Sequence, residues 1–281
     1  MNQKLLALYG LKWNPFAPNV PVEALIRSPE IDNFCWRVEN LTREGGFALI
    51  TSEPGLGKSV ALRMLTDQLR AQRELSVGIL TRPQASLQDF YRELGHLFDV
   101  QLTPHNRWAG TRVLRERWHK HIDAALLRPV LVIDEAQEMA PCVLNELRLL
   151  AAIDLDSRCL LTVVLAGDLR LTDKFRAQEL LPLGSRIRVR LALTPATPQE
   201  LHDCLNHVLT QAGNTHLMTP ELMTTLAEHA AGNYRILMTM AGELLDTAVQ
   251  RDADQMDEKL YLEVFAVPNT HERGRAKPVV H

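Results

Sequence analysis

Short apolar runs alternate with helical patterns through the first two thirds of the chain. The runs predict strands at about residues 47–51, 75–80, 129–134, 159–166 and 187–192. Between them, apolar residues recur three and four positions apart, as on helices that bury one face. This alternation predicts an α/β fold, a parallel five-stranded sheet with helices on both faces.

The strand pattern stops near Thr194, and helix-start signals take its place. Thr197 and Glu200 form a capping box around Pro198, and Thr219 precedes Pro220 in the same way. We therefore predict an α/β core over residues 1–193, a small all-α lid over 194–265 and a flexible basic tail over 266–281. Within the core, we predict further helices that begin at Ser86 and near residue 107, the second reaching about residue 127.

Composition narrows the class of protein. The 281 residues are 46% apolar and 23% charged, with a net charge of −3. No apolar run is long enough to span a membrane, and the four cysteines form neither a metal-type pair nor a disulfide framework. We read no export signal near the N-terminus and expect a cytoplasmic protein without a membrane partner. The charge argues against a protein coated in basic residues.

A glycine-rich turn follows the first predicted strand. Residues 51–59 read Thr-Ser-Glu-Pro-Gly-Leu-Gly-Lys-Ser, and a helix begins at Lys58. Such a turn directs backbone N–H groups and a helix N-terminus at phosphate. Lys58 is placed to reach the β- and γ-phosphates of ATP, and the Ser59 hydroxyl to bind Mg²⁺. The predicted nucleotide-binding residues here are Pro54, Gly55, Leu56, Gly57, Lys58, Ser59 and Val60.

An acid pair follows the third predicted strand. Val130 to Ile133 is apolar on both faces, as in a central parallel strand, and Asp134 and Glu135 come next. We predict that Asp134 holds the Mg²⁺ water shell and that Glu135 polarises the attacking water. Together with Lys58, the pair predicts an ATP hydrolase.

Ser52 departs from the loop pattern, which has glycine at this first position. If the backbone at Ser52 required a positive φ, the serine would cost about 1–2 kcal/mol.

These features resemble the AAA+ ATPases, P-loop NTPases with a helical lid, and within them the group typified by ExeA and the transposon-borne TniB proteins. The segment from Tyr9 to Phe16 looks like the group's N-terminal Gly-Leu-x-x-x-Pro-Phe segment. The sequence from Ile133 to Gln137, followed by 144–150, is similar to its extended Walker B region. The resemblance runs from about Leu8 to Val249.

The resemblance implies four further site residues. Phe16 would lie beside the adenine, and Arg235 would act as a second sensor that reaches the nucleotide from the lid. Arg186 would be an arginine finger that completes a neighbouring subunit's site. Asp168 stands where the family places a polar sensor, often glutamine or asparagine, but an ionised carboxylate cannot donate a hydrogen bond. Ordinary alternatives are a surface arginine at 186 and a helix-start salt bridge at 235.

The resemblance leaves three roles open. The first is a transposition regulator with a role like that of TnsC and MuB, which would oligomerise with ATP on double-stranded DNA as a ring or filament and recruit a transposase, with or without an adaptor. The second is an ExeA-like ATPase for assembly of an envelope secretion complex. Its relatives usually carry a membrane segment and a peptidoglycan-binding region, so we expect transposition. The third is a nucleotide-gated switch with little turnover, against which Glu135 argues.

Two stretches are candidates for DNA contact. The loop after the second strand carries Thr81, Arg82 and Gln84, and the helix near residue 107 carries Arg112 and Arg115. Hydroxyl, amide and guanidinium groups of this kind contact phosphates. Charges at helical spacing are equally typical of a solvated face.

Overall fold

The chain folds into two compact units. The computed structural model describes residues 2–80, 83, 86–100, 107–124, 127–153 and 158–265. One unit is Pro21–Pro195, and the other combines Met1–Val20 with Ala196–His281. The predicted tail over 266–281 lies outside the described residues.

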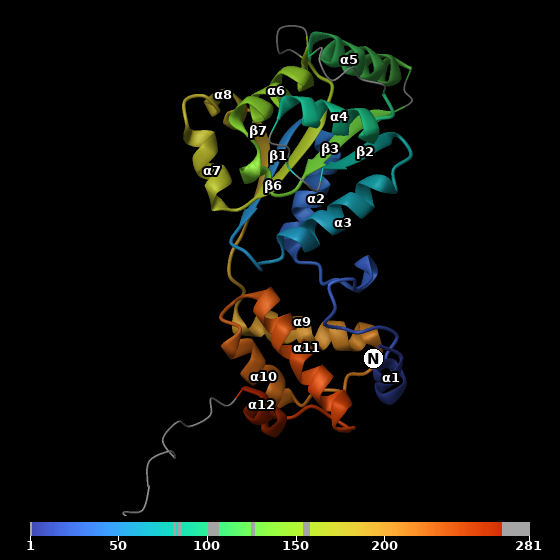
Figure 1. Ribbon diagram of the computed structural model, residues 1–281, viewed down its shortest axis with the longest axis vertical. Helices are drawn as coiled ribbons and strands as arrows, with labels where there is room; N and C mark the ends of the chain where they lie inside the picture. The colour runs from blue at the N-terminus through green and yellow to red at the C-terminus, as the bar shows by residue number, and fades with distance from the viewer. Residues whose placement is uncertain are drawn as a thin grey trace, which may run out of the picture. The chain divides into compact units, whose positions relative to one another are not determined.

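A parallel sheet forms the centre of the first unit (Figure 1). Its strand order is β2-β3-β6-β1-β7. The strands are β1 (Gly46–Ser52), β2 (Leu75–Leu80), β3 (Arg128–Ile133), β6 (Thr162–Gly167) and β7 (Ile187–Leu193). The predicted α/β class, with five parallel strands and a helical C-terminal region, is confirmed.

The fourth predicted strand is two elements. Residues 159–166 were expected to form one strand, but β5 (Arg158–Cys159) pairs antiparallel with β4 (Ala152–Ile153), and only β6 enters the large sheet. The apolar run continues between them because Leu160 and Leu161 are buried outside any strand. Apolarity therefore marked burial here, and not the strand boundary.

Helices cover both faces of this sheet. They are α2 (Pro29–Leu41), α3 (Lys58–Arg70), α4 (Leu87–Leu97), α5 (Arg107–Asp123), α6 (Pro141–Ala151), α7 (Leu169–Arg176) and α8 (Leu181–Gly184), with 3-10 turns η1 (Val22–Ala24) and η2 (Ala136–Glu138). Ser86 caps α4 as predicted, by accepting the Asp89 N–H. The helix predicted to run to residue 127 ends at Asp123. None of the described helices is both long and apolar enough to cross a lipid bilayer.

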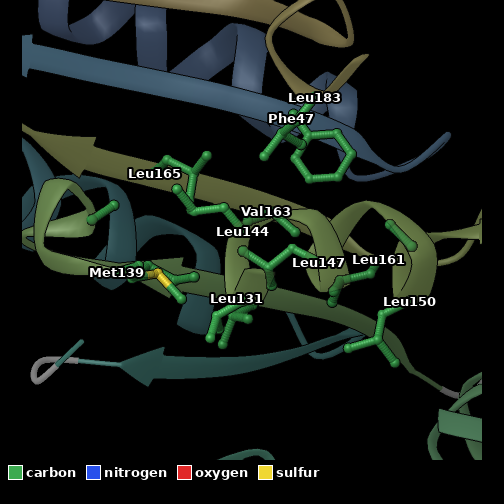
Figure 2. Close-up of a cluster of buried hydrophobic side chains, with 14 of the residues drawn as sticks. Phe47, Leu131, Met139, Leu144, Leu147, Leu150, Leu161, Val163, Leu165 and Leu183 are labelled. Atoms are coloured by element: carbon green, nitrogen blue, oxygen red, sulfur yellow. The ribbon is translucent and has the colours of Figure 1, made fainter. Parts of the chain in front are cut away.

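Alternate strand residues serve two separate cores. Ala48, Ile50 and Val132 point to the face covered by α2 and α3. Leu131 and Leu165 point to the opposite face, where α4 to α8 pack. Figure 2 shows part of this second core, with α6 residues such as Leu144 and Leu147 against the strands. Burial on both faces is the reason the central strands are apolar throughout.

The second unit is helical. It contains α1 (Asn2–Tyr9), α9 (Pro198–Ala212), α10 (Pro220–His229), α11 (Tyr234–Gln250) and α12 (Glu258–Phe265). The predicted capping box is present, since Thr197 accepts the Glu200 N–H while Glu200 accepts the Thr197 N–H. Thr219 and Asn233 cap α10 and α11.

The N-terminal segment belongs to this helical unit, although we expected it in the α/β core. The Tyr9 hydroxyl donates to the Ala253 carbonyl at 2.8 Å, and the Lys12 N–H donates to the Ala212 carbonyl at 2.9 Å. Leu5 and Leu11 are buried as well. These partners lie about 200 residues away in sequence, so local pattern could not reveal them.

Candidate nucleotide-binding site

Parallel pairing brings the carboxyl ends of β1, β3 and β6 to one edge of the sheet. From β1 the chain turns through Gly55 and Gly57, whose φ values of 88° and 97° are favourable for glycine alone. Gly57 is the N-cap of α3, and no side chain caps this helix. The first N–H groups of a helix have no partner within it. They are thus available to an anion held in the turn.

Lys58 meets both predicted acids at this edge. Its Nζ lies 2.7 Å from Oε1 of Glu135 and 3.9 Å from Oδ1 of Asp134. The Lys58 side chain is only 12% exposed, which makes an unpaired charge there costly. A triphosphate would offer Lys58 a stronger counter-charge than the carboxylates do. The lysine is therefore poised to exchange Glu135 for phosphate.

Asp134 and Glu135 differ in environment. Burial raises the pKa of Asp134, whose Oδ1 accepts the Glu135 N–H at 2.9 Å. Burial also acts to raise the pKa of Glu135, but hydrogen bonds from Lys58 and Gln137 and the charge of Lys58 outweigh it and lower that pKa. Glu135 is thus ionised at neutral pH and can accept a proton.

The backbone at Glu135 is left-handed, with φ of 52°. Such a conformation in a non-glycine residue costs of order 1–3 kcal/mol and persists where surrounding contacts impose it. Here it turns Glu135 away from the line of β3 and toward Lys58.

The residues predicted to hold Mg²⁺ offer suitable chemistry. Ser59 presents an exposed hydroxyl on the first turn of α3, and Asp134 presents a partly exposed carboxylate at the end of β3. Mg²⁺ binds few protein oxygens directly and keeps several waters. One hydroxyl and one carboxylate beside a phosphate cradle fit that requirement.

Other loop residues support the phosphate-binding turn by packing against the protein. Leu56 is buried, and Val60 packs against the core formed by α2 and α3. Pro54 and Gly55 form the turn that precedes them. These side chains shape the loop, whereas phosphate contact would fall to its backbone.

Asp168 lies at the same edge but has a role that we did not predict. It caps α7, since its carboxylate accepts the Arg170 N–H at 2.9 Å, and it also accepts from the Arg170 guanidinium at 2.8 Å. The hydrogen bond from Arg170 lowers the pKa of Asp168. Its carboxylate is therefore engaged as a helix cap and ion-pair partner.

Gln137 is a site residue that our reading of the sequence missed. It is 4% exposed, its amide NH₂ donates to Oε2 of Glu135, and its carbonyl accepts the Asp168 N–H at 3.2 Å. The available signal was an uncharged polar residue two positions after the acid pair. Its partner across the sheet edge could not be read from sequence.

Ser52 does not require a positive φ. It is the last residue of β1, in extended conformation opposite Leu193 of β7, so the strain considered above does not arise. The side chain is 2% exposed, and Oγ has no hydrogen-bond partner among the described residues.

We expect Ser52→Ala to leave ATP affinity within about twofold and to raise the free energy of unfolding by about 1 kcal/mol, because a buried unsatisfied hydroxyl is removed. Calorimetric titration and urea unfolding would measure the two quantities. A loss of affinity greater than tenfold would show that the hydroxyl serves the nucleotide.

Three sets of predicted residues remain: Arg186, the pair Phe16 and Arg235 in the helical unit, and the candidates for DNA contact. Arg186 directly precedes β7, and its Nη1 donates to the Pro182 carbonyl at 2.5 Å. Phe16 is buried in the helical unit, and Arg235 is on α11 of that unit, so their contacts with nucleotide stay predictions.

The DNA-contact candidates are only partly described. Thr81, Arg82 and Gln84 lie outside the described residues. Arg112 pairs with Glu116 at 3.4 Å on the surface of α5. Arg115 donates to the Ala152 carbonyl at 2.6 Å and is half-buried, which leaves it less available to phosphate.

Comparison with known proteins finds similar sequences and folds. Residues 41–175 match a family model described as an AAA domain. Over 216 residues the chain is 31% identical to the General secretion pathway protein A of Aeromonas hydrophila. The match covers 75% of this chain and 39% of that protein, so the chain spans well under half of its relative's length.

Solved structures share the fold at low identity. Cdc6p from Pyrobaculum aerophilum is 16% identical with a TM-score of 0.69, over 90% of this chain and 71% of that one. ORC2 of Aeropyrum pernix is 14% identical with a TM-score of 0.71, over 89% and 71%. The RuvB branch migration motor of Thermotoga maritima is 16% identical with a TM-score of 0.57, over 89% and 72%. Residues 41–175 are therefore similar to an AAA domain, and the chain has an AAA+ fold like that of Cdc6p, ORC2 and RuvB.

Proposed function

We propose that this chain binds ATP with Mg²⁺ and hydrolyses it. The observation that carries the proposal is the convergence of Lys58, Asp134 and Glu135 at one sheet edge, beside the glycine turn at Gly57. Lys58 and the loop backbone hold the phosphates. Ser59 and Asp134 would hold Mg²⁺, whose charge would neutralise that of the phosphates.

Glu135 is the proposed base. It pairs with Lys58, so both groups are held near the phosphate site without an uncompensated charge. Phosphate binding draws Lys58 away and leaves Oε1 of Glu135 free to accept a hydrogen bond from water. The transfer of Lys58 from Glu135 to phosphate thereby both binds the nucleotide and frees the proposed base.

For the cellular role, we favour the secretion reading over the transposition reading that we first expected. The supporting observation is the 31% identity to General secretion pathway protein A. The match leaves more than half of that relative uncovered, so the finding that none of the described helices could span a membrane does not argue for transposition. We propose an ATPase that works in assembly of an envelope secretion complex.

Duplex DNA distinguishes the two roles. ATP turnover and filter binding should be measured with and without double-stranded DNA at several salt concentrations, because phosphate contacts weaken steeply with salt. The secretion role predicts turnover that is indifferent to DNA. Turnover that rises with DNA at low salt, together with ATP-dependent DNA binding, would restore the transposition role. Deletion of the gene, followed by assay of secreted proteins and of transposition frequency, gives the corresponding test in cells.

A further inference from the structure

Gln137 links the two strand ends that frame the reaction site. It lies in η2, directly after Glu135, and both ends of its amide are bonded. The NH₂ group donates to Glu135 Oε2, and the carbonyl accepts the N–H of Asp168, the residue that follows β6. The amide thus spans from the β3 side to the β6 side.

Its partners fix the orientation of this amide. Reversal would set the amide oxygen against the Glu135 carboxylate and the NH₂ against a backbone N–H, which are both repulsive. Gly167 also matters, since a Cβ built at that residue would lie 2.4 Å from Oε1 of Gln137. The glycine at the end of β6 therefore makes room for the glutamine.

The turn that carries Gln137 is itself anchored to α7. Nζ of Lys174 donates to the backbone carbonyls of Gln137 and Met139, the latter at 3.0 Å. Arg170 bonds Glu138 at 2.7 Å. With its backbone and its amide both held, Gln137 can present one fixed donor to Glu135.

We propose that Gln137 is the positioning residue of the hydrolytic site, holding Oε2 of Glu135 so that Oε1 faces the attacking water. The proposal rests on the proposed hydrolysis of ATP. When phosphate takes Lys58 from Glu135, the hydrogen bond from Gln137 is the contact that keeps the carboxylate in place. Without it, an exposed glutamate with a strained backbone would sample several rotamers.

This role replaces the one expected of Asp168. A carboxylate at that position is occupied by Arg170 and cannot donate a hydrogen bond, whereas an amide can. Gln137 brings an amide next to Asp168 from the turn that follows the neighbouring strand, β3. The main-chain N–H of Asp168 then serves to orient it.

Gln137→Ala tests the proposal. We expect kcat to fall about 10²-fold, as for a misplaced catalytic group, while KM, the Kd for ATP and the unfolding midpoint change little. Gln68→Ala is the matched control, because Gln68 also donates to a glutamate, Glu39 at 2.7 Å, and both lie near the C-terminal ends of α3 and α2, whereas the site is at the N-terminus of α3. That variant should retain wild-type turnover.

A double variant separates positioning from general structural support. If Gln137 acts only through Glu135, Glu135→Gln with Gln137→Ala should hydrolyse ATP no more slowly than Glu135→Gln alone. Single-turnover assays with γ-labelled ATP would make the slow residual rates measurable.

Several outcomes would overturn the proposal. They are unchanged kcat in Gln137→Ala, a parallel loss of ATP affinity or unfolding midpoint, an equal loss in Gln68→Ala, and additive losses in the double variant. If the wild type itself does not hydrolyse ATP, the proposed function fails and this inference fails with it. An active wild type with an equally active Gln137→Ala refutes the inference alone.

Discussion

The Glu135→Gln variant is expected to hydrolyse ATP about 10³ times more slowly than the wild type, within the range typical of a lost general base. The amide keeps the size of the side chain but cannot accept a proton from water. The carboxylate of the wild-type residue can accept that proton.

Binding of ATP should survive this change. Glu135 pairs with Lys58 at 2.7 Å and would compete with phosphate for it, whereas glutamine would compete less because it carries no charge. We therefore expect an ATP affinity equal to or slightly above that of the wild type. Lys58→Ala, in contrast to Glu135→Gln, should lose affinity for the nucleotide.

The measurements are phosphate release for turnover and calorimetric titration with ATP for affinity. Glu74→Gln is the control, since Glu74 is an exposed glutamate just before β2, at the other edge of the sheet. Normal turnover in Glu135→Gln would remove Glu135 from the mechanism. A loss of turnover that merely follows a loss of ATP binding would do the same.

Local sequence signals predicted much of this molecule. The strand, glycine turn and helix around Lys58, the acids after β3 and the caps at Ser86 and Thr197 all depend on neighbours within a few residues. Strands that are buried on both faces can also be recognised in the sequence, because they form an uninterrupted run of apolar residues. These are the features for which short-range pattern and physical cause coincide.

The remaining features depend on contacts between distant residues. Gln137 acquires its role from the N–H of Asp168 and the space left by Gly167, thirty residues further along the chain. The Asp168 carboxylate accepts hydrogen bonds from Arg170, and the role expected of Asp168 as a sensor stays a prediction. Nothing in the pattern around either residue reveals these partners, since a polar side chain at a strand end suits a sensor and a helix cap equally well.

The position of Arg186 relative to the sheet predicts in which subunit it could reach phosphate. It precedes Ile187, which pairs with Phe47 near the start of β1, whereas the phosphate loop follows Ser52 at the end of that strand. Along β1, the five-residue step from Phe47 to Ser52 covers about 17 Å, which is more than an arginine side chain can span. If Arg186 stabilises transferring phosphate, it must do so in the site of another subunit.

Arg186→Ala should accordingly reduce turnover about 10³-fold, as expected for an arginine finger, while each protomer still binds ATP. Arg188→Ala is the matched control, because Arg188 lies two residues further along the chain, in β7, and pairs with Glu44 at 3.0 Å. Equal losses in both variants would indicate a general effect of charge on this strand.

Mixing inactive proteins tests whether the arginine acts between subunits. An Arg186→Ala protomer keeps an intact Glu135, and a Glu135→Gln protomer keeps an intact Arg186, so a head-to-tail interface between them can contain one complete site. At equal amounts about one quarter of random interfaces have this arrangement, and turnover should recover to about that fraction of the wild-type rate. Recovery would place Arg186 and Glu135 in different subunits of one site. If turnover stays at the level of the separate variants at every mixing ratio, Arg186 is a surface arginine and the site is complete within one chain.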